Sequence, residues 1–298
     1  MANALTNLNH TLLAQRVLEG FTAAMAPITG FANDYSADAA ARGDKVKVLY
    51  VGGQDDAVDF TGTYTMQDAD AEGLDISLNK HKFTSWGLTD KEIWEKPQLE
   101  VERFMRQKGF RLGKAVFQDI LSIITAANYG NATGDVTTVT AANFDLEEVI
   151  DLSIKADNKD FPEMDRVLML KPAYHGAIRK DINPADVYGS DEVIRRGVVG
   201  SVDTFSRLYK SNLIPANSES LEGFAGHPDA ILTAMRYHRP QDGHDYAIAE
   251  PVTDPDTGMT LGLRGWYDRD TGTMKMVMEA VYGYRVGVPT GIVRIKSA

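Results

Sequence analysis

The chain contains no cysteine, which excludes disulfide bonds, thiolate metal ligands and thiolate nucleophiles. No apolar run approaches the roughly 18 residues that a membrane-spanning helix needs. The first residues, MANALTNLNHTL, do not place an apolar run after a basic one, so we expect no secretory signal and no membrane partner. A net charge of −11 disfavours a dedicated nucleic-acid binder, although it leaves room for a local basic face.

The common signatures of catalysis and cofactor binding are missing as well. There is no G-x-x-x-x-G-K-[ST], G-x-G-x-x-G, G-x-S-x-G or H-E-x-x-H motif, and the six histidines are scattered. Asp268, Asp270 and Glu279 have the spacing of the two ends of a calcium-binding loop. The glycine that such a loop needs at its sixth position stands at the fifth, as Gly272, so we predict a hairpin turn there instead.

What the chain does contain is an ordinary globular composition. Its 298 residues are 43% hydrophobic and 24% charged, which is typical of a soluble protein of about two domains.

The most conspicuous pattern is a long amphipathic helix, which we predict over residues 97–128. Apolar residues recur at helical spacing from Val101 to Ala127. Pro97 suits a first helical turn, and Asn128 can close the last one. Such a helix would be about 45 Å long. Few compact domains need that length, so we expect the helix to brace an elongated body.

A second amphipathic helix is predicted over residues 7–26, directly before Pro27. Leu13, Val17 and Phe21 repeat along it at a spacing of four residues. Two interpretations remain open. The helix is either an ordinary core helix or an arm that docks on a neighbouring subunit.

Residues 45–88 predict a long β-hairpin that projects from the body. Its strands are expected at 45–51 and 74–86, where the sequence alternates. Between 53 and 75 the chain has seven acidic residues and no basic one. Short apolar pieces stand in this middle part at Val58, Phe60 and Tyr64. A projecting hairpin buries too little surface to be stable alone, so we expect it to need a partner.

The remaining segments predict a mixed α+β chain. Asn143 or Asp145 can cap a helix, and further helices are expected at 173–180 and 228–237. Strands are expected at 166–170, 259–267, 274–284 and 292–295, with a hairpin turn at 268–272.

This order of elements resembles the major capsid (coat) proteins of tailed bacteriophages, which have the Hong Kong 97-type fold. Five segments carry the resemblance, and together they cover essentially the whole chain. They are 81–90 leading into the long helix, 166–172 with a helix behind it, 197–215, the short alanine-rich segment 228–236, and 282–289 near the end.

The resemblance implies an α+β, Hong Kong 97-like capsid fold with five parts. These are an N-terminal arm with a short helix (1–44), an extended loop with its base strands (45–88), a peripheral domain with the spine helix 97–128 (89–142), an axial domain (143–257) and strands that return to the peripheral domain (258–298).

The resemblance also implies a structural protein without catalytic residues, cofactor or metal. It would assemble in the bacterial host cytoplasm into the icosahedral shell of the virion, around the phage genome. The implied partners are other copies in hexamers and pentamers, a separate scaffolding protein, a portal, a decoration protein and, by proximity, packaged double-stranded DNA.

We expect the acidic stretch 53–75 to face basic residues of the long helix on a neighbouring copy. The residues expected at contacts between subunits are Leu13, Val17, Phe21, Val58, Phe60, Tyr64, Arg103, Arg106 and Arg111. Two alternatives remain: an encapsulin-type nanocompartment shell, and, from a different class, an unrecognised soluble α+β enzyme or small-molecule binding module.

Overall fold

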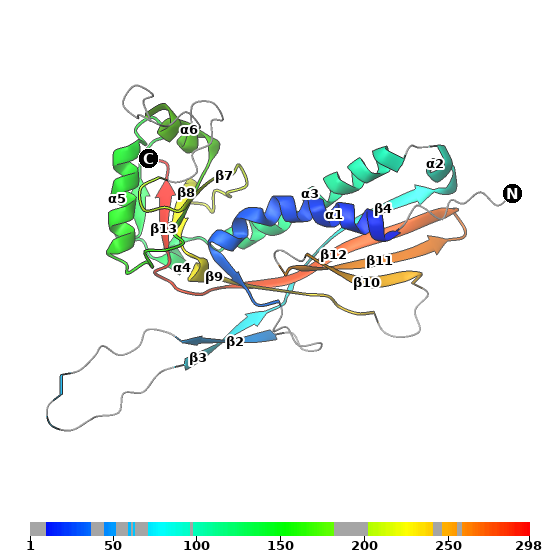
Figure 1. Ribbon diagram of the computed structural model, residues 1–298, viewed down its shortest axis with the longest axis horizontal. Helices are drawn as coiled ribbons and strands as arrows, with labels where there is room; N and C mark the ends of the chain where they lie inside the picture. Colours follow the sequence, from blue (N-terminus) through cyan, green and yellow to red (C-terminus); the bar gives the residue numbers. More distant parts are fainter. Residues whose placement is uncertain are drawn as a thin grey trace.

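The computed structural model describes residues 10–36, 45–51, 59–60, 62, 71–95, 98–181, 202–240, 246–254 and 258–298. Figure 1 shows an elongated body, a smaller body at one end of it, and a two-stranded hairpin that projects away from both. The C-terminus lies in the smaller body.

The elongated body is built on a sheet of six described strands. In spatial order they are β1 (Ala32–Asp34), β9 (Ile231–Arg236), β12 (Thr273–Val286), β11 (Thr260–Asp268) and β10 (Ile248–Thr253), with β4 (Lys80–Thr89) also paired to β12. β12 is long enough to pair with β11 along its first half and with β9 along its second half. Its other edge pairs with β4, so one strand holds the whole sheet together.

Two helices, α1 (His10–Met25) and α3 (Gln98–Leu121), lie over one face of this sheet (Figure 1). The alternate β12 residues Met276, Met278 and Ala280 point into the same core as Val17 and Val116 of the helices. The opposite face of the sheet carries no described helix (Figure 1). The short helix α2 (Asp90–Glu95) joins β4 to the start of α3.

The smaller body has a five-stranded sheet with its own core. Its strands are, in order, β5 (Val136–Thr138), β13 (Ile292–Lys296), β8 (Leu221–Gly226), β6 (Val167–Leu170) and β7 (Arg207–Lys210). The helices α5 (Leu146–Asp157) and α6 (Pro172–Asp181) cover one face, where Val149 and Ile178 meet Leu168 and Val293. Of the two candidate caps, Asn143 and Asp145, the structure selects Asp145 as the N-cap of α5, because its carboxylate accepts the Glu148 N–H at 3.1 Å.

The projecting hairpin consists of β2 (Lys45–Val51) and β3 (Ala71–Ser77), paired antiparallel. Val46 and Ile76 pack at its base against Leu232 of β9. Gly283 of β12 lies so close to this base that a Cβ there would be 2.1 Å from the Ser77 carbonyl oxygen. The hairpin is therefore fixed to the large sheet at one end.

The hairpin's second strand is shorter than predicted. A single strand was expected over 74–86, but β3 ends at Ser77 and β4 begins at Lys80, and β4 joins the large sheet instead. The alternating pattern continues across Leu78 and Asn79 although the strand changes sheets there, so periodicity alone did not reveal the break.

The long helix is also shorter than predicted at its C-terminal end. α3 ends at Leu121, and a separate short helix, α4 (Ala126–Tyr129), follows a turn. At 24 residues α3 is about 36 Å long. The Asn217 side chain donates to the carbonyl oxygens of Leu121 (2.9 Å) and Ile124 (2.7 Å), so a distant residue caps the end of α3.

The prediction of a helix over residues 228–237 is wrong. Pro228–Ala230 forms only a 3-10 turn, η3, and β9 follows directly. All six residues of β9 are buried. A strand buried on both faces is apolar along its length, and such a run resembles a helix of the same length. A second 3-10 turn, η1 (Ala26–Gly30), follows α1 at Pro27.

Candidate interaction surfaces

The helix pair α1–α3 accounts for three of the residues expected at subunit contacts. Leu13, Val17 and Phe21 are all buried, and they pack in the core of this same chain. The expectation that these residues are buried only by a neighbouring subunit is therefore wrong. Of the two interpretations of α1, the ordinary core helix is the correct one. Sequence could not decide this, because the glycines that let α3 approach α1 lie some ninety residues further along.

The outer face of α3 is strongly basic. Between Arg103 and Gln118 the chain has five basic residues and no acidic one, in a protein of net charge −11. Arg103, Arg106, Arg111 and Lys114 are all exposed. Arg103, Arg106 and Arg111 border a shallow groove next to α1, together with Phe110, whose side chain is 45% exposed. We name Arg103, Arg106, Arg111 and Lys114 the arginine strip. The three arginines are thus on the surface of this chain, and their contact with a neighbouring copy stays a prediction.

The hairpin residues can be followed only in part. Phe60 is 64% exposed in this chain. Val58 and Tyr64, the other two apolar residues expected to contact a neighbour, lie outside the described residues.

The possible calcium loop is a hairpin turn, as predicted. Asp268 accepts a hydrogen bond from Lys275, and this partner holds the pKa of Asp268 down at about 2. Glu279 lies on the same face of the sheet, but six residues along β12 from Thr273, the residue paired with Asp268, and it pairs there with Arg264 at 2.7 Å and with His81 at 3.1 Å. The carboxylates do not converge. Among the described residues no group of three or more histidines and carboxylates is placed to hold a metal ion.

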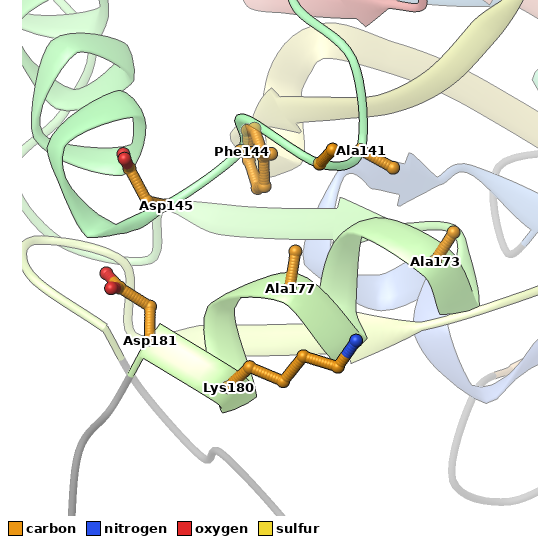
Figure 2. Close-up of a pocket in the computed structure, with 8 residues that line it drawn as sticks. Ala141, Phe144, Asp145, Ala173, Ala177, Lys180 and Asp181 are labelled. Atoms are coloured by element: carbon orange, nitrogen blue, oxygen red, sulfur yellow. The ribbon is translucent and has the colours of Figure 1, made fainter.

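A groove in the smaller body was not anticipated from the sequence (Figure 2). It runs between α6 and the loop before α5, and four alanines line it: Ala141, Ala142, Ala173 and Ala177. Figure 2 shows Phe144 and Ala141 on one wall and Ala173 and Ala177 on the other. We name it the alanine groove.

Three charged side chains border the alanine groove. Asp145 is held by its capping bond, and Asp181 accepts the Leu146 N–H at 3.0 Å. Lys180 is exposed, and its side chain runs back along α6 beside the alanines (Figure 2). The two carboxylates thus bond to N–H groups at the start of α5, and the edge of the groove carries two negative charges and one positive charge.

The outer side of α5 carries a second unanticipated surface. Ile150 and Ile154 are 49% and 50% exposed, one helical turn apart. Their neighbours Glu147, Asp151 and Asp157 are exposed as well. The sequence held a usable signal, because Val149, Leu152 and Ala156 already form one complete apolar face and leave the two isoleucines off it. We name Ile150 and Ile154 the isoleucine stripe.

No helix of the described residues is long and apolar enough to cross a membrane. No protein-family model and no curated protein matches the chain.

Solved structures do match, along most of the chain. A structure from Mycobacterium phage Che8 is 18% identical, with a TM-score of 0.61 over 91% of this chain and 90% of that one. The mature capsid of bacteriophage PhiM1 is 12% identical, with a TM-score of 0.60 over 91% and 86%. The capsid of cyanophage P-SCSP1u is 14% identical, with a TM-score of 0.57 over 90% and 86%. The chain thus has the fold of phage capsid subunits, and the predicted fold is confirmed.

Proposed function

We propose that this protein is the major capsid protein of a tailed bacteriophage, and that many copies assemble into the icosahedral shell that encloses the phage genome. The observation that carries the proposal is the match to the PhiM1 capsid subunit over 91% of this chain and 86% of that one. Its role is structural, without catalysis.

The five-part division expected from the sequence underlies the proposed assembly. The elongated body corresponds to the peripheral domain, and it also takes in α1 and the strands β9 and β10. The smaller body corresponds to the axial domain, and it also takes in β5 and β13. The β2–β3 hairpin is the base of the extended loop. A hairpin that projects from the body exposes more backbone and side chain than it buries, which favours a role in contacting other copies.

We propose that the arginine strip and the extended loop lie at contacts between copies. Arg103, Arg106 and Arg111 are exposed on one face and offer a site of positive charge. The stretch 53–75, with Val58, Phe60 and Tyr64, supplies negative charge and apolar side chains. Leu13, Val17 and Phe21 take no part, since the chain itself covers them.

The proposed setting follows from the same role. The copies form hexamers and pentamers in the host cytoplasm and remain in the virion. A separate scaffolding protein, a portal and a decoration protein are the proposed partners, with packaged double-stranded DNA close to the inner wall.

The experiment is to purify the protein and examine it by sedimentation and negative-stain microscopy over a range of salt concentrations. Shells, tubes or rings of capsomers are expected. A monomer that persists at high protein concentration under every salt condition would contradict the proposal. Particles isolated from the native source should contain phage DNA, whereas particles filled with protein cargo and free of nucleic acid would indicate a cellular compartment.

A further inference from the structure

The strand β4 is an edge of the large sheet. It pairs with β12 on one side, and no described strand pairs with its outer side. The backbone groups of successive residues alternate between the two sides of such a strand. The Asp90 N–H donates to the Gly272 carbonyl oxygen on the β12 side, whereas the Ser85 carbonyl oxygen accepts a bond from Lys108 at 3.3 Å. The odd-numbered residues of β4 therefore direct their backbone groups outward.

These outward backbone groups are available to a partner. Apart from the Ser85 carbonyl oxygen, none of the outward N–H and C=O groups between His81 and Gly87 takes part in a hydrogen bond within the part of the chain that the structure describes. The strand is ten residues long, contains no proline and keeps one continuous register with β12. A long, regular edge of this kind readily pairs with a further strand.

The features that usually protect an edge strand are absent from β4. Lysines commonly guard such edges. Lys80 and Lys82 are instead turned toward α3, where Lys82 donates to the Ala115 carbonyl oxygen at 2.7 Å. The edge strand β10 carries Pro251, which has no N–H to donate, and β1 has only three residues. Of these edges, β4 is thus the one best able to accept a further strand.

Apolar surface is exposed along the same edge. Phe83 lies near the middle of β4 with 64% of its surface exposed, and the centroid of the His81 ring lies 6.5 Å from that of Phe83. Phe104 of α3 is 44% exposed and borders a groove together with Gly87 and Leu88 of β4. A second strand laid along β4 would cover part of this surface, which is favourable.

We propose that β4 of one copy pairs antiparallel with β4 of a second copy, in a register centred on Phe83. The same strand serves both copies, so the contact is isologous. Because the backbone of Phe83 is directed outward, the two Phe83 residues form a hydrogen-bonded pair. Both rings lie on the face of the sheet that carries no described helix, since Phe83 is paired with Glu279 and the neighbouring Met278 points into the core. Aromatic side chains paired across two strands stabilise a sheet.

The charges of β4 favour this register. The two lysines of the strand, Lys80 and Lys82, stand opposite residues without charge. These residues are Trp86 and Thr84. A register centred on Lys82 would instead place lysine opposite lysine, which is destabilising. A second copy therefore matches this edge in hydrogen bonds, apolar surface and charge.

The proposal rests on the proposed shell function, which requires contacts between copies, and it names one of them. An isologous contact is complete with two copies. It therefore joins two copies across a two-fold axis, as between neighbouring rings, and leaves the contacts within a hexamer or pentamer to other surfaces.

The absence of native cysteine allows a direct test by disulfide trapping. Phe83→Cys protein is oxidised under assembly conditions and analysed for a covalent dimer. A dimer is expected, because the Cα atoms of a hydrogen-bonded pair lie about 5.5 Å apart, within the range of a disulfide. The native side chain is exposed, so the unfolding midpoint of the variant should stay close to that of the wild type.

The matched control is Ser85→Cys, which is exposed on the same face of the same strand. In the proposed register the two Ser85 residues are about 13 Å apart along the strand, beyond the reach of a disulfide. Ser85→Cys alone should give no dimer, whereas its mixture with His81→Cys should give one. Equal dimer yields from Phe83→Cys and Ser85→Cys, each alone, would overturn the proposal. A Phe83→Cys protein that dimerises better with Thr253→Cys, on β10, would overturn it as well.

A second measurement uses charge in place of thiols. Phe83→Lys and Phe83→Glu each place like charges opposite one another, so each variant alone should lower the yield of sedimenting particles at least about tenfold. An equal mixture of the two variants should recover most of the yield, because lysine then stands opposite glutamate. A mixture that recovers nothing would overturn the register centred on Phe83.

The outcomes for the wild type separate this contact from the shell function. Wild-type protein that assembles, together with Phe83→Lys and Phe83→Glu variants that assemble equally well, would refute the β4 contact alone. Wild-type protein that never assembles would contradict the shell function. A Phe83→Cys dimer formed in that case would still support the β4 contact, and the lack of a dimer would refute both proposals.

Discussion

Gly109 of α3 lies directly against the backbone of Val17 in α1. A Cβ placed on Gly109 would be 1.9 Å from the carbonyl oxygen of Val17. A Cβ placed on Gly20 of α1 would likewise be 2.1 Å from the carbonyl oxygen of Arg106 in α3. The two helices therefore touch backbone to backbone, and no side chain larger than hydrogen can stand at either position.

Gly109→Ala should consequently destabilise the chain by about 1–3 kcal/mol, because the helices must separate to admit the methyl group. Urea unfolding followed by circular dichroism measures the change. Gly176→Ala in α6 is the control, since a Cβ there meets nothing within 4 Å. It should stabilise by up to about 1 kcal/mol, as alanine is the better helix former. A neutral Gly109→Ala would mean that the helices do not pack this closely.

Asn217 should be needed for the end of α3. Replacing it by glycine preserves its backbone conformation, with φ at 48°, while removing both hydrogen bonds to the carbonyls of Leu121 and Ile124. We expect a loss of about 1–3 kcal/mol in the free energy of unfolding. Thermal unfolding measures it. Asn217→Asp should be at least as harmful, because a carboxylate cannot donate to carbonyl oxygens, and equal stability of all three proteins would contradict the capping role.

His227 should make stability depend on pH. The ring is buried against Phe161, and its Nδ1 accepts the Asp229 N–H, so it is held in the neutral form. Burial lowers its pKa below the usual 6.5. The unfolded chain then binds more protons than the folded chain, so stability is full above about pH 6.5 and is lost as pH falls through the lower, folded-state pKa.

The corresponding variant is His227→Asn, which can still accept the Asp229 N–H but cannot be protonated. Urea midpoints measured between pH 7.5 and pH 5 should fall less steeply for this variant than for the wild type. Part of the slope should remain, because burial also lowers the pKa of His175 and His238. Identical slopes would show that His227 is not the titrating group.

Two positions of α3 should separate folding from assembly. Val116 is fully buried, so Val116→Asp places an unpaired charge in the core and should prevent folding. Arg106 is exposed, and Arg106→Glu should leave the unfolding midpoint unchanged while lowering assembly and altering its salt dependence. If reversing the charges of Arg103, Arg106 and Arg111 together had no effect on assembly, the arginine strip would not lie at a contact between copies.

The sequence predicted the fold and most of its elements because the local patterns were strong. α1, the start of the hairpin, the capping by Asp145 and the turn at 268–272 all depend on neighbouring residues, and all are present. The errors involve contacts between distant residues. Asn217 ends α3 from nearly a hundred positions away, and β9 is a strand because it lies buried between β1 and β12.

The interaction surfaces were predicted less well, for a related reason. Exposed arginines on an amphipathic helix can be assigned to its outer face by periodicity, and Arg103, Arg106 and Arg111 are indeed exposed. Whether Leu13 or Phe21 meets its own chain or a neighbour depends on the tertiary fold, and periodicity gives the same pattern in both cases. The alanine groove depends on two segments, around Ala141 and Ala173, that meet only after folding.

The attachment of the hairpin to Gly283 has a mechanical consequence. The hairpin is held at one end by β12, through the close approach of Gly283 and through Arg285, which donates to the Asp75 carbonyl oxygen at 3.2 Å. It therefore moves as a lever fixed at that end. Seven-residue strands such as β2 and β3 extend about 23 Å. A rotation of about 5° at the fixed end would displace the far end of a strand of that length by roughly 2 Å. A slight change of twist in β12, which is also the strand that joins β4, β9 and β11, is thereby amplified at the far end of the hairpin.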